Sequence, residues 1–161
     1  MTNILFKKIK SGRLGLIISL ILFVLAFLFE KRINLPQIFS NHLISIGLTA
    51  FFAALFIIIF LWSVRSLPRR ERDNTLCAKG AYKYFRHPIY AAFLSAFNLG
   101  LVFLLNNYIY LIWAILLHPI WHLIINQEEK LLIEIFGNDY INYQTSTGRF
   151  IPKIIKSRSI T

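Results

Sequence analysis

Long uncharged apolar segments alternate with short polar connections along this chain. Four such segments stand out, and they cover residues 14–29, 43–64, 89–105 and 108–125. A helix needs about 20 apolar residues, within a range of about 17–25, to cross the hydrocarbon core of a bilayer. The second segment meets this length by itself, and basic residues at the ends of the first can extend their charged groups to the interface. The pattern predicts a single all-α integral membrane domain with four transmembrane helices.

Local signals indicate where these helices begin and end. Asn106 and Asn107 separate the third and fourth segments and suit a tight turn, so we expect an antiparallel helical hairpin. Pro88 suits the first turn of the third helix, where its missing N–H costs nothing. Residues 127–136 predict a helix that continues the fourth span, and Gly137 is the residue type that ends helices in a left-handed conformation. No small-residue cleavage site follows the first segment, so we expect it to be retained as a span.

The basic residues determine the predicted orientation. The chain has 18 Lys and Arg against 7 Asp and Glu, although 57% of its 161 residues are hydrophobic. If four spans alternate, 16 of the basic residues fall on one side of the membrane and two, Lys31 and Arg32, on the other. The positive-inside rule therefore places both termini, the loop of residues 65–88 and the tail of residues 126–161 in the cytoplasm, where we expect the site. The same distribution explains the net charge of +11 without a nucleic-acid partner, and we expect none.

Several classes of site lack their sequence signals. Cys77 is the single cysteine, which excludes an internal disulfide and a multi-cysteine metal cluster. The chain has no glycine-rich dinucleotide motif, phosphate loop or nucleophile elbow, so we expect no Rossmann cofactor domain. His118 and His122 are four residues apart on the fourth span, but two such residues without a nearby carboxylate or cysteine are a weak metal signal. We therefore predict no metal site.

Polar and aromatic residues gather at the entrance to the third span. Tyr82, Arg86, His87 and Tyr90 all lie within residues 80–90. Tyrosine at the headgroup level and arginine on lipid phosphate are common anchors at span ends, and this interpretation stays open. An imidazole at a protein–membrane boundary can also bond a ligand and titrate near neutrality. His87 therefore favours a functional site.

Two carboxylates lie where the fourth span leaves the membrane, Glu128 and Glu129. Ionised residues so close to hydrocarbon are costly unless they are paired or hydrated, so each is a candidate for a functional site. Adjacent residues point about 100° apart on a helix. We expect one of the two to face the bundle, and we expect Glu129 to lie at a solvated helix end.

Several motifs follow one another along about residues 73–152, roughly half of the chain. They are Gly80-x-Tyr82-x-x-x-Arg86-His87-Pro88-x-Tyr90, a helical hairpin, Glu128-Glu129, Phe136-Gly137-x-x-Tyr140-x-x-Tyr143 and Arg149-Phe150-Ile151-Pro152. Their order and spacing resemble the isoprenylcysteine carboxyl methyltransferase family, whose broader group includes phospholipid methyltransferases. The resemblance implies an integral membrane enzyme that takes methyl from S-adenosylmethionine.

The resemblance also implies which residues hold this cofactor. They are a stretch upstream of the motif, a tyrosine five residues before its histidine, the His-Pro-x-Tyr segment itself and the first glutamate of the pair. In this chain, these positions are Asn74, Thr75, Leu76 and Cys77, then Tyr82, then His87, Pro88, Ile89 and Tyr90, and finally Glu128. The chemistry of these residues agrees independently. The carboxylate of Glu128 can pair with the ammonium or accept from the ribose. The faces of Tyr82 and Tyr90 suit adenine or the sulfonium cation, and Arg86 or backbone N–H groups suit the carboxylate.

The methyl acceptor is expected to differ from that of prenylcysteine enzymes. Those enzymes carry an arginine, used for substrate, four residues before the glutamate, where this chain has Ile124. We therefore expect a lipophilic or membrane-associated small acceptor that enters from the lipid bilayer. Transfer would be a direct displacement at the methyl carbon. A thiol or hydroxyl acceptor would want a base, for which His87 and Glu129 are the nearby catalytic candidates.

Two other functions fit the composition. One is an NADPH-dependent membrane reductase of the sterol-reductase type, whose cofactor phosphates could be bound by Arg69, Arg70 and Arg72. The other is a non-enzymatic membrane protein that binds lipid or a partner through its basic loops. Our prediction is a multi-pass methyltransferase of the cytoplasmic membrane, and titration with S-adenosylhomocysteine and NADPH distinguishes the three.

Overall fold

The structure is a computed structural model that describes residues 2–67 and 76–153, with residues 2–10 described by their backbone alone. Its helices are α1 (Thr2–Glu30), α2 (His42–Ser66), η1 (Gly80–Lys83), α3 (Pro88–Ala91), η2 (Ala92–Phe97), α4 (Asn98–Leu105), α5 (Tyr108–Phe136) and α6 (Asn138–Ser146). The described part of the chain contains no β-strand. The all-α prediction is therefore confirmed.

Within the described residues, four helical stretches are long and apolar enough to cross a membrane. They are Ser11–Glu30, His42–Ser66, Pro88–Leu105 and Tyr108–Phe136. Each contains one of the four apolar segments of the sequence, so the four-span prediction is confirmed. The protein is a multi-pass membrane protein.

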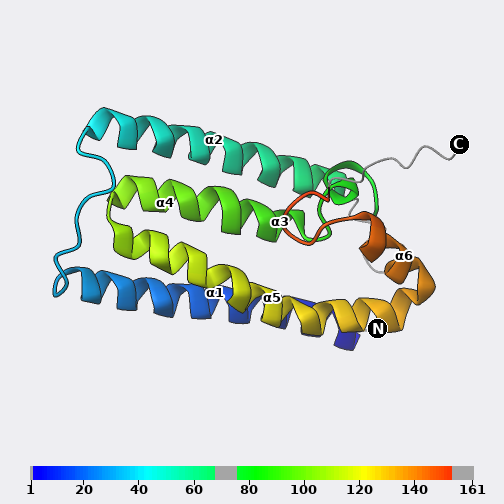
Figure 1. The fold of residues 1–161 in the computed structure, drawn as a ribbon. Coiled ribbons are helices and arrows are strands. Elements are labelled where there is room, and N and C mark those ends of the chain that lie inside the picture. Colours follow the sequence, from blue (N-terminus) through cyan, green and yellow to red (C-terminus); the bar gives the residue numbers. More distant parts are fainter. Residues whose placement is uncertain (1, 68–75, 154–161) are drawn as a thin grey trace, which may run out of the picture.

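The four spans form a layered bundle in which sequence neighbours are not always spatial neighbours. α1 packs chiefly on α5, α2 packs on η2 and α4, and α4 contacts α5. The order across the bundle is therefore α2, the third span, α5 and α1, as Figure 1 shows. The first and last spans, α1 and α5, therefore lie side by side, although α2 and the third span separate them in the sequence.

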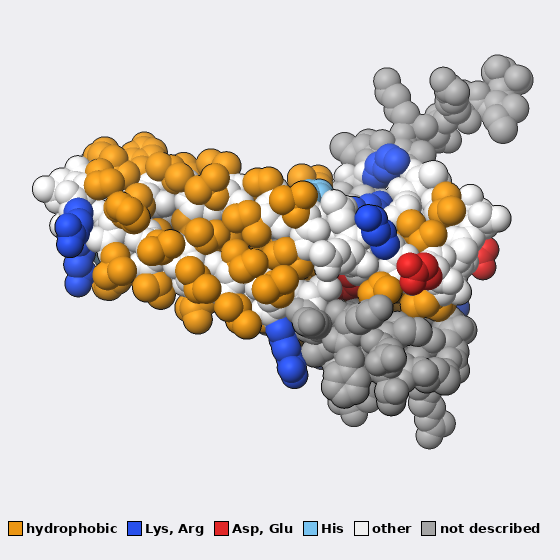
Figure 2. All heavy atoms as spheres, turned by 90° about the horizontal axis from the view of Figure 1, so that it is seen from below, with side chains coloured by type: hydrophobic (Ala, Val, Ile, Leu, Met, Phe, Trp, Pro, Cys, Tyr) orange, Lys and Arg blue, Asp and Glu red, His pale blue; other side chains and the backbone are white. Residues whose placement is uncertain are grey.

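The outer surface of the bundle is apolar over most of its length. Large hydrophobic side chains on α1 and α2, such as Leu20 and Leu43, are exposed. Figure 2, which views the side of α1, shows hydrophobic side chains covering the elongated part of this face, while charged side chains gather at one end and at the opposite tip. Such a surface suits lipid, since hydrocarbon in water would be costly.

Small residues and indole hydrogen bonds hold α1 against α5. A Cβ atom at Gly15 would lie 2.7 Å from Trp121 Cζ2, so only glycine allows this approach. Trp121 Nε1 donates to Ser19 Oγ at 2.9 Å, and Trp113 Nε1 donates to the Ser19 carbonyl at 3.2 Å. Both indole N–H groups are buried and paired, which removes the desolvation cost of placing them inside the bundle.

The turn between the third and fourth spans is as short as the sequence predicts. Asn106 adopts the left-handed conformation, with φ 48° and ψ 40°, and ends α4. Asn107 caps α5, because its side-chain oxygen accepts from the Ile109 N–H at 2.9 Å. The Asn106 side chain also bonds both the N–H and the carbonyl of Phe39, which ties this turn to the connection between α1 and α2. The hairpin prediction is confirmed.

The helix boundaries that lie next to the site also agree with the sequence. Pro88 occupies the first turn of α3. α5 runs without interruption through residues 126–136 to Gly137, which has φ 55°. The third span contains a feature that the apolar pattern did not predict, because η2 is π-helical. π-Helical turns are frequent at functional sites, and this one begins two residues after Tyr90.

One end of the bundle carries the remaining structure. η1, α6, the start of α1 and the last described residues of the tail all lie at this end, whereas the hairpin turn lies at the other (Figure 1). The loop and the tail therefore meet on one face, as an even number of spans requires. That this face is cytoplasmic stays a prediction.

Candidate functional site

A pocket opens at the end of the bundle where the loop and the tail meet. Its empty space, with the open solvent at its mouth included, is about 800 Å³. The described residues that line it are Leu67, Leu76, Cys77, Tyr82, Arg86, His87, Pro88, Ile89, Tyr90, Glu128, Leu132, Phe136, Tyr140 and Tyr143. Apolar walls with a few polar groups are typical of small-molecule sites.

The pocket gathers the residues that the sequence singled out for cofactor binding. Of the predicted set, those that line it are Leu76, Cys77, Tyr82, Arg86, His87, Pro88, Ile89, Tyr90 and Glu128. Asn74 and Thr75 lie outside the described residues, as do Arg69, Arg70 and Arg72. Every predicted cofactor residue that the structure describes therefore borders one cavity.

Other lining residues were given no role by the sequence reasoning. Leu132 and Phe136 follow Glu128 at intervals of four residues on α5, so they share its helical face. That spacing was a usable signal. Tyr140 and Tyr143 come from α6 and line the pocket only because the helix direction changes at Gly137.

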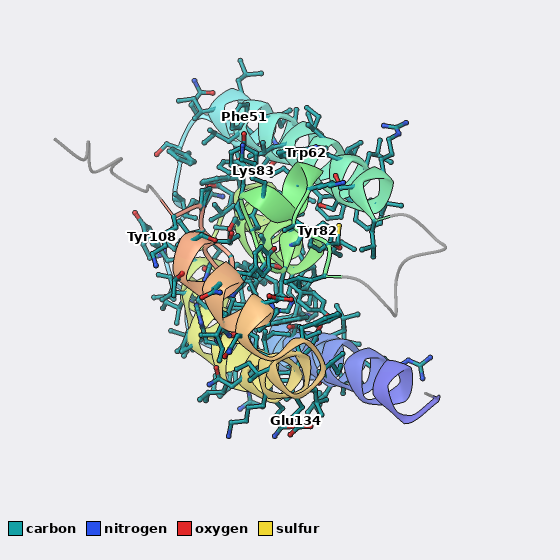
Figure 3. All side chains as sticks on the ribbon, turned by 90° about the vertical axis from the view of Figure 1, so that its right-hand side faces the viewer. Phe51, Trp62, Tyr82, Lys83, Tyr108 and Glu134 are labelled. Atoms are coloured by element: carbon teal, nitrogen blue, oxygen red, sulfur yellow. The ribbon has the colours of Figure 1, made fainter. Side chains whose placement is uncertain are left out.

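A single serine positions the loop that carries Tyr82. Ser66, at the end of α2, accepts from the Ala81 N–H at 3.0 Å through its side chain, and its carbonyl lies 3.3 Å from Cys77 Sγ. Gly80 has φ +59°, and a Cβ atom there would lie 2.2 Å from Ser66 Oγ. Figure 3, which views this end of the bundle, shows Tyr82 near its middle, between α2 and the lower helices.

Glu129 is the centre of a buried ion-pair network. Its side chain is 4% exposed, and its carboxylate accepts from Arg86 Nε at 2.8 Å and from Arg149. His87 Nε2 lies 3.3 Å from the same carboxylate, and Gln144 Nε2 donates to it at 3.3 Å. Such charge-assisted bonds are the condition for burying a carboxylate.

The expectation that Glu129 meets water was therefore wrong. Its partners Arg86 and Arg149 lie 43 and 20 residues away in the sequence, so no local pattern on α5 could reveal them. Glu128 is buried as well, at 1% exposure, and lines the pocket. Both carboxylates face the protein interior because the tail folds back over the exit of α5.

Arg86 joins the loop to the tail. Its guanidinium donates to the Glu129 carboxylate, and it also donates to the Thr147 carbonyl at 2.5 Å and to the Gln144 carbonyl at 3.2 Å. The Arg86 N–H also donates to the Gly148 carbonyl at 2.7 Å. Arg86 borders the pocket, but these contacts favour a role in holding the tail over one as the partner of a ligand carboxylate.

His87 lies between the two carboxylates. Its Nε2 atom faces Glu129, and its Nδ1 atom lies 3.7 Å from Glu128 Oε1. The Tyr90 hydroxyl donates to Glu128 Oε2 at 3.4 Å, and the Tyr90 ring stacks on the imidazole at a centroid distance of 5.7 Å. At 6% exposure, His87 is too buried for the interfacial anchor that composition left open.

The two α6 tyrosines differ in how their hydroxyls are satisfied. The Tyr143 hydroxyl donates to the Tyr82 carbonyl at 2.5 Å, which fixes α6 against the loop. The Tyr140 hydroxyl has no hydrogen-bond partner among the described residues, although Tyr140 is 1% exposed. Burial raises the pKa of both hydroxyls above the ordinary value, so each stays protonated and able to donate.

The two span histidines do not form a metal centre with neighbouring side chains. Arg149 donates to His122 Nδ1 at 3.1 Å, and the His122 ring lies edge-on to Phe150. His118 instead lines a second, mostly apolar cavity between the third span and α5, with about 510 Å³ of empty space when the open solvent at its mouth is included. Within residues 2–67 and 76–153, no group of three or more His, Cys, Asp or Glu could hold a metal ion.

Taken with its fold, this site defines a multi-pass α-helical membrane protein with a pocket at one end of its bundle. Comparison with known proteins identifies its family. Residues 43–134, more than half of the chain, match the model of the isoprenylcysteine carboxyl methyltransferase (ICMT) family. The chain belongs to this family.

Individual relatives share the same region. A methanethiol S-methyltransferase of Pseudomonas deceptionensis is 36% identical over 94 residues, which are 54% of this chain and 32% of that protein. Protein-S-isoprenylcysteine O-methyltransferases of Schizosaccharomyces pombe and Saccharomyces cerevisiae are 33% and 36% identical over 87 and 89 residues. These alignments cover 53% of this chain and 36% of each yeast protein. The chain thus spans about a third of the length of the relatives it matches.

Proposed function

We propose that this chain is an integral membrane methyltransferase that uses S-adenosylmethionine and a lipophilic or membrane-associated acceptor. One observation carries the proposal. The residues that the family resemblance implies for the cofactor come from the loop, the start of the third span and α5, and those described all border one pocket. A family relationship over more than half of the chain supports the same activity.

The pocket residues fit the chemical groups of this cofactor. Glu128 is a buried carboxylate at the pocket wall, suited to an ammonium or a ribose hydroxyl. The aromatic rings of Tyr82 and Tyr90 suit adenine or a sulfonium cation. Leu132 and Phe136 supply an apolar wall. S-adenosylmethionine would supply an electrophilic methyl group bound to a sulfonium sulfur.

The second cavity supports lateral entry of the acceptor. It lies within the span region and is lined by Leu94, Ser95, Leu99, Leu111, Ala114, Ile115, His118 and Ile151. Ile151 follows Phe150, whose ring lies 6.3 Å from the His87 ring at the first pocket. The tail residues 150–151 therefore connect the linings of the two cavities. An apolar molecule dissolved in the bilayer would reach the second cavity without crossing water.

The nature of the acceptor follows from one substituted position. Prenylcysteine enzymes carry an arginine where this chain has Ile124, which removes a cationic partner for a prenylcysteine carboxylate. One relative is named for methanethiol, a small thiol. We therefore favour a small lipophile without a carboxylate as the acceptor.

The residues around the pocket would contribute mainly alignment and exclusion of water. A direct displacement forms one bond from the acceptor atom to the methyl carbon as the sulfur–carbon bond breaks, so no covalent nucleophile is required. For a thiol or hydroxyl acceptor, His87 is the better placed proton acceptor because it borders the pocket. Glu129 is occupied by two guanidinium groups, which favours a role in positioning His87.

Calorimetry on the purified full chain in detergent tests the proposal. S-adenosylhomocysteine should bind saturably, and Glu128→Gln should weaken it by about 1.5–3 kcal/mol, or about tenfold or more. Glu134→Gln is the matched control, since Glu134 is exposed on the same helix and points away from the bundle in Figure 3. If the chain binds NADPH saturably and does not bind S-adenosylhomocysteine, the result would indicate the reductase. Binding of neither ligand would indicate the non-enzymatic protein.

A further inference from the structure

The hydroxyl of Tyr140 differs from those of Tyr90 and Tyr143 in its hydrogen bonding. The Tyr90 hydroxyl donates to Glu128, and the Tyr143 hydroxyl donates to the Tyr82 carbonyl. The Tyr140 hydroxyl is buried and has no partner within the described part of the chain. Leaving a buried hydroxyl unpaired is costly, and native proteins rarely do so without a ligand or a water in place.

The fold fixes Tyr140 in the lining of the pocket. Gly137, with φ +55°, lets the chain turn from α5 into α6, and Tyr140 lies about one turn into α6. The Tyr140 ring also packs against Tyr143 at a centroid distance of 5.8 Å. Its phenol stays protonated because burial, followed by the charge of Glu129, raises its pKa. The group is therefore a fixed hydrogen-bond donor.

The nearby charges indicate what it can donate to. Arg86 and Arg149 both pair with Glu129, whereas Glu128, which lines the pocket, faces His87 Nδ1 at 3.7 Å. The Arg86 guanidinium is bonded to Glu129 and to two tail carbonyls. If Glu128 binds the ammonium of an amino-acid group, the carboxylate on the same carbon lies only a few ångströms away. A protonated phenol that borders the same pocket suits that carboxylate.

We propose that the Tyr140 hydroxyl donates a hydrogen bond to the α-carboxylate of the ligand and, with Glu128, selects a free amino-acid group. This inference rests on the proposed function. It assigns Tyr140 a part in binding the amino-acid end of S-adenosylmethionine, whereas the tyrosine rings next to it serve other parts of the ligand.

The test compares two ligands on three proteins. Tyr140→Phe keeps the ring and removes only the hydroxyl, and Tyr108→Phe is the matched control, because Tyr108 is exposed at the opposite end of the bundle. Each full-length protein in detergent is titrated calorimetrically with S-adenosylhomocysteine and with its decarboxylated analogue. Thermal unfolding without ligand is measured in parallel.

For Tyr140→Phe we expect S-adenosylhomocysteine to bind about tenfold to a hundredfold more weakly. Affinity for the decarboxylated analogue should stay within about twofold, and the unfolding temperature without ligand should stay equal or rise, because no internal bond is lost. Tyr108→Phe should match the unsubstituted chain on both ligands.

Other results overturn the inference in separate ways. Unchanged S-adenosylhomocysteine affinity in Tyr140→Phe, with normal binding by the unsubstituted chain, refutes the contact and leaves the proposed function intact. Equal weakening of both ligands assigns the hydroxyl to another group and refutes the carboxylate. A large drop in unfolding temperature without ligand shows an internal partner. Failure of the unsubstituted chain to bind S-adenosylhomocysteine refutes the proposed function itself.

Discussion

Replacing Arg149 with methionine tests whether the buried network holds the tail over the site. Arg149 bonds Glu129 and donates to the His122 carbonyl at 3.0 Å and to His122 Nδ1 at 3.1 Å. Its side chain is 15% exposed, so water replaces few of these contacts when the guanidinium is removed. Methionine keeps an apolar stem of similar shape, which restricts the change to the charged group.

The magnitude follows from what remains around Glu129. Removing one partner of a buried ion pair costs about 3–5 kcal/mol when the other charge is left unpaired. Here Arg86 still bonds the carboxylate at 2.8 Å, so we expect a loss near the lower end, about 3 kcal/mol. For a chain of this length the unfolding temperature should fall by about 6–12 °C.

The measurement is thermal unfolding of purified protein in detergent, followed by circular dichroism. Lys153→Met is the matched control, because Lys153 is exposed and bonds only the Thr145 carbonyl among its described contacts. Its unfolding should change by less than about 1 kcal/mol. The double variant with Glu129→Gln should lose less than the sum of the two single losses, by about 0.5–3 kcal/mol. A loss for Arg149→Met no larger than that for Lys153→Met would refute the network as the anchor of the tail.

Three further predictions concern the site, the orientation and the tail. His87→Ala should elute from size-exclusion chromatography as a folded protein but transfer methyl about tenfold to a hundredfold more slowly, and normal transfer would remove His87 from the reaction. A reporter fused to the C-terminus should report cytoplasm and one at Gln37 the opposite side, and a reversed result would contradict the charge argument. Gly148→Ala should destabilise the fold by about 2 kcal/mol or more, because its Cβ atom would lie 1.8 Å from a backbone oxygen. Gly47→Ala, with open space around it, should be neutral or slightly stabilising, and equal effects in thermal unfolding would contradict the steric reason.

The sequence by itself determined the features that depend on near neighbours. The length of the apolar segments decided the four spans, because the bilayer thickness sets that length. Asn106, Pro88 and Gly137 marked a turn, a helix start and a helix end, since each has a backbone preference that acts locally. The motif order also indicated most of the residues that border the pocket.

Only the tertiary structure decided the environment of the site. Glu129 and Glu128 are adjacent on one helix, and nothing in that stretch indicates that both are buried or that Glu129 bonds Arg86 and Arg149. The position of Tyr140 depends likewise on how α6 folds back after α5. These contacts join residues 20 to 43 positions apart, so they form only when the loop, the span exit and the tail pack together. Local propensity acts over a few residues, whereas the burial that sets the chemistry of a carboxylate or a phenol depends on every element packed around it.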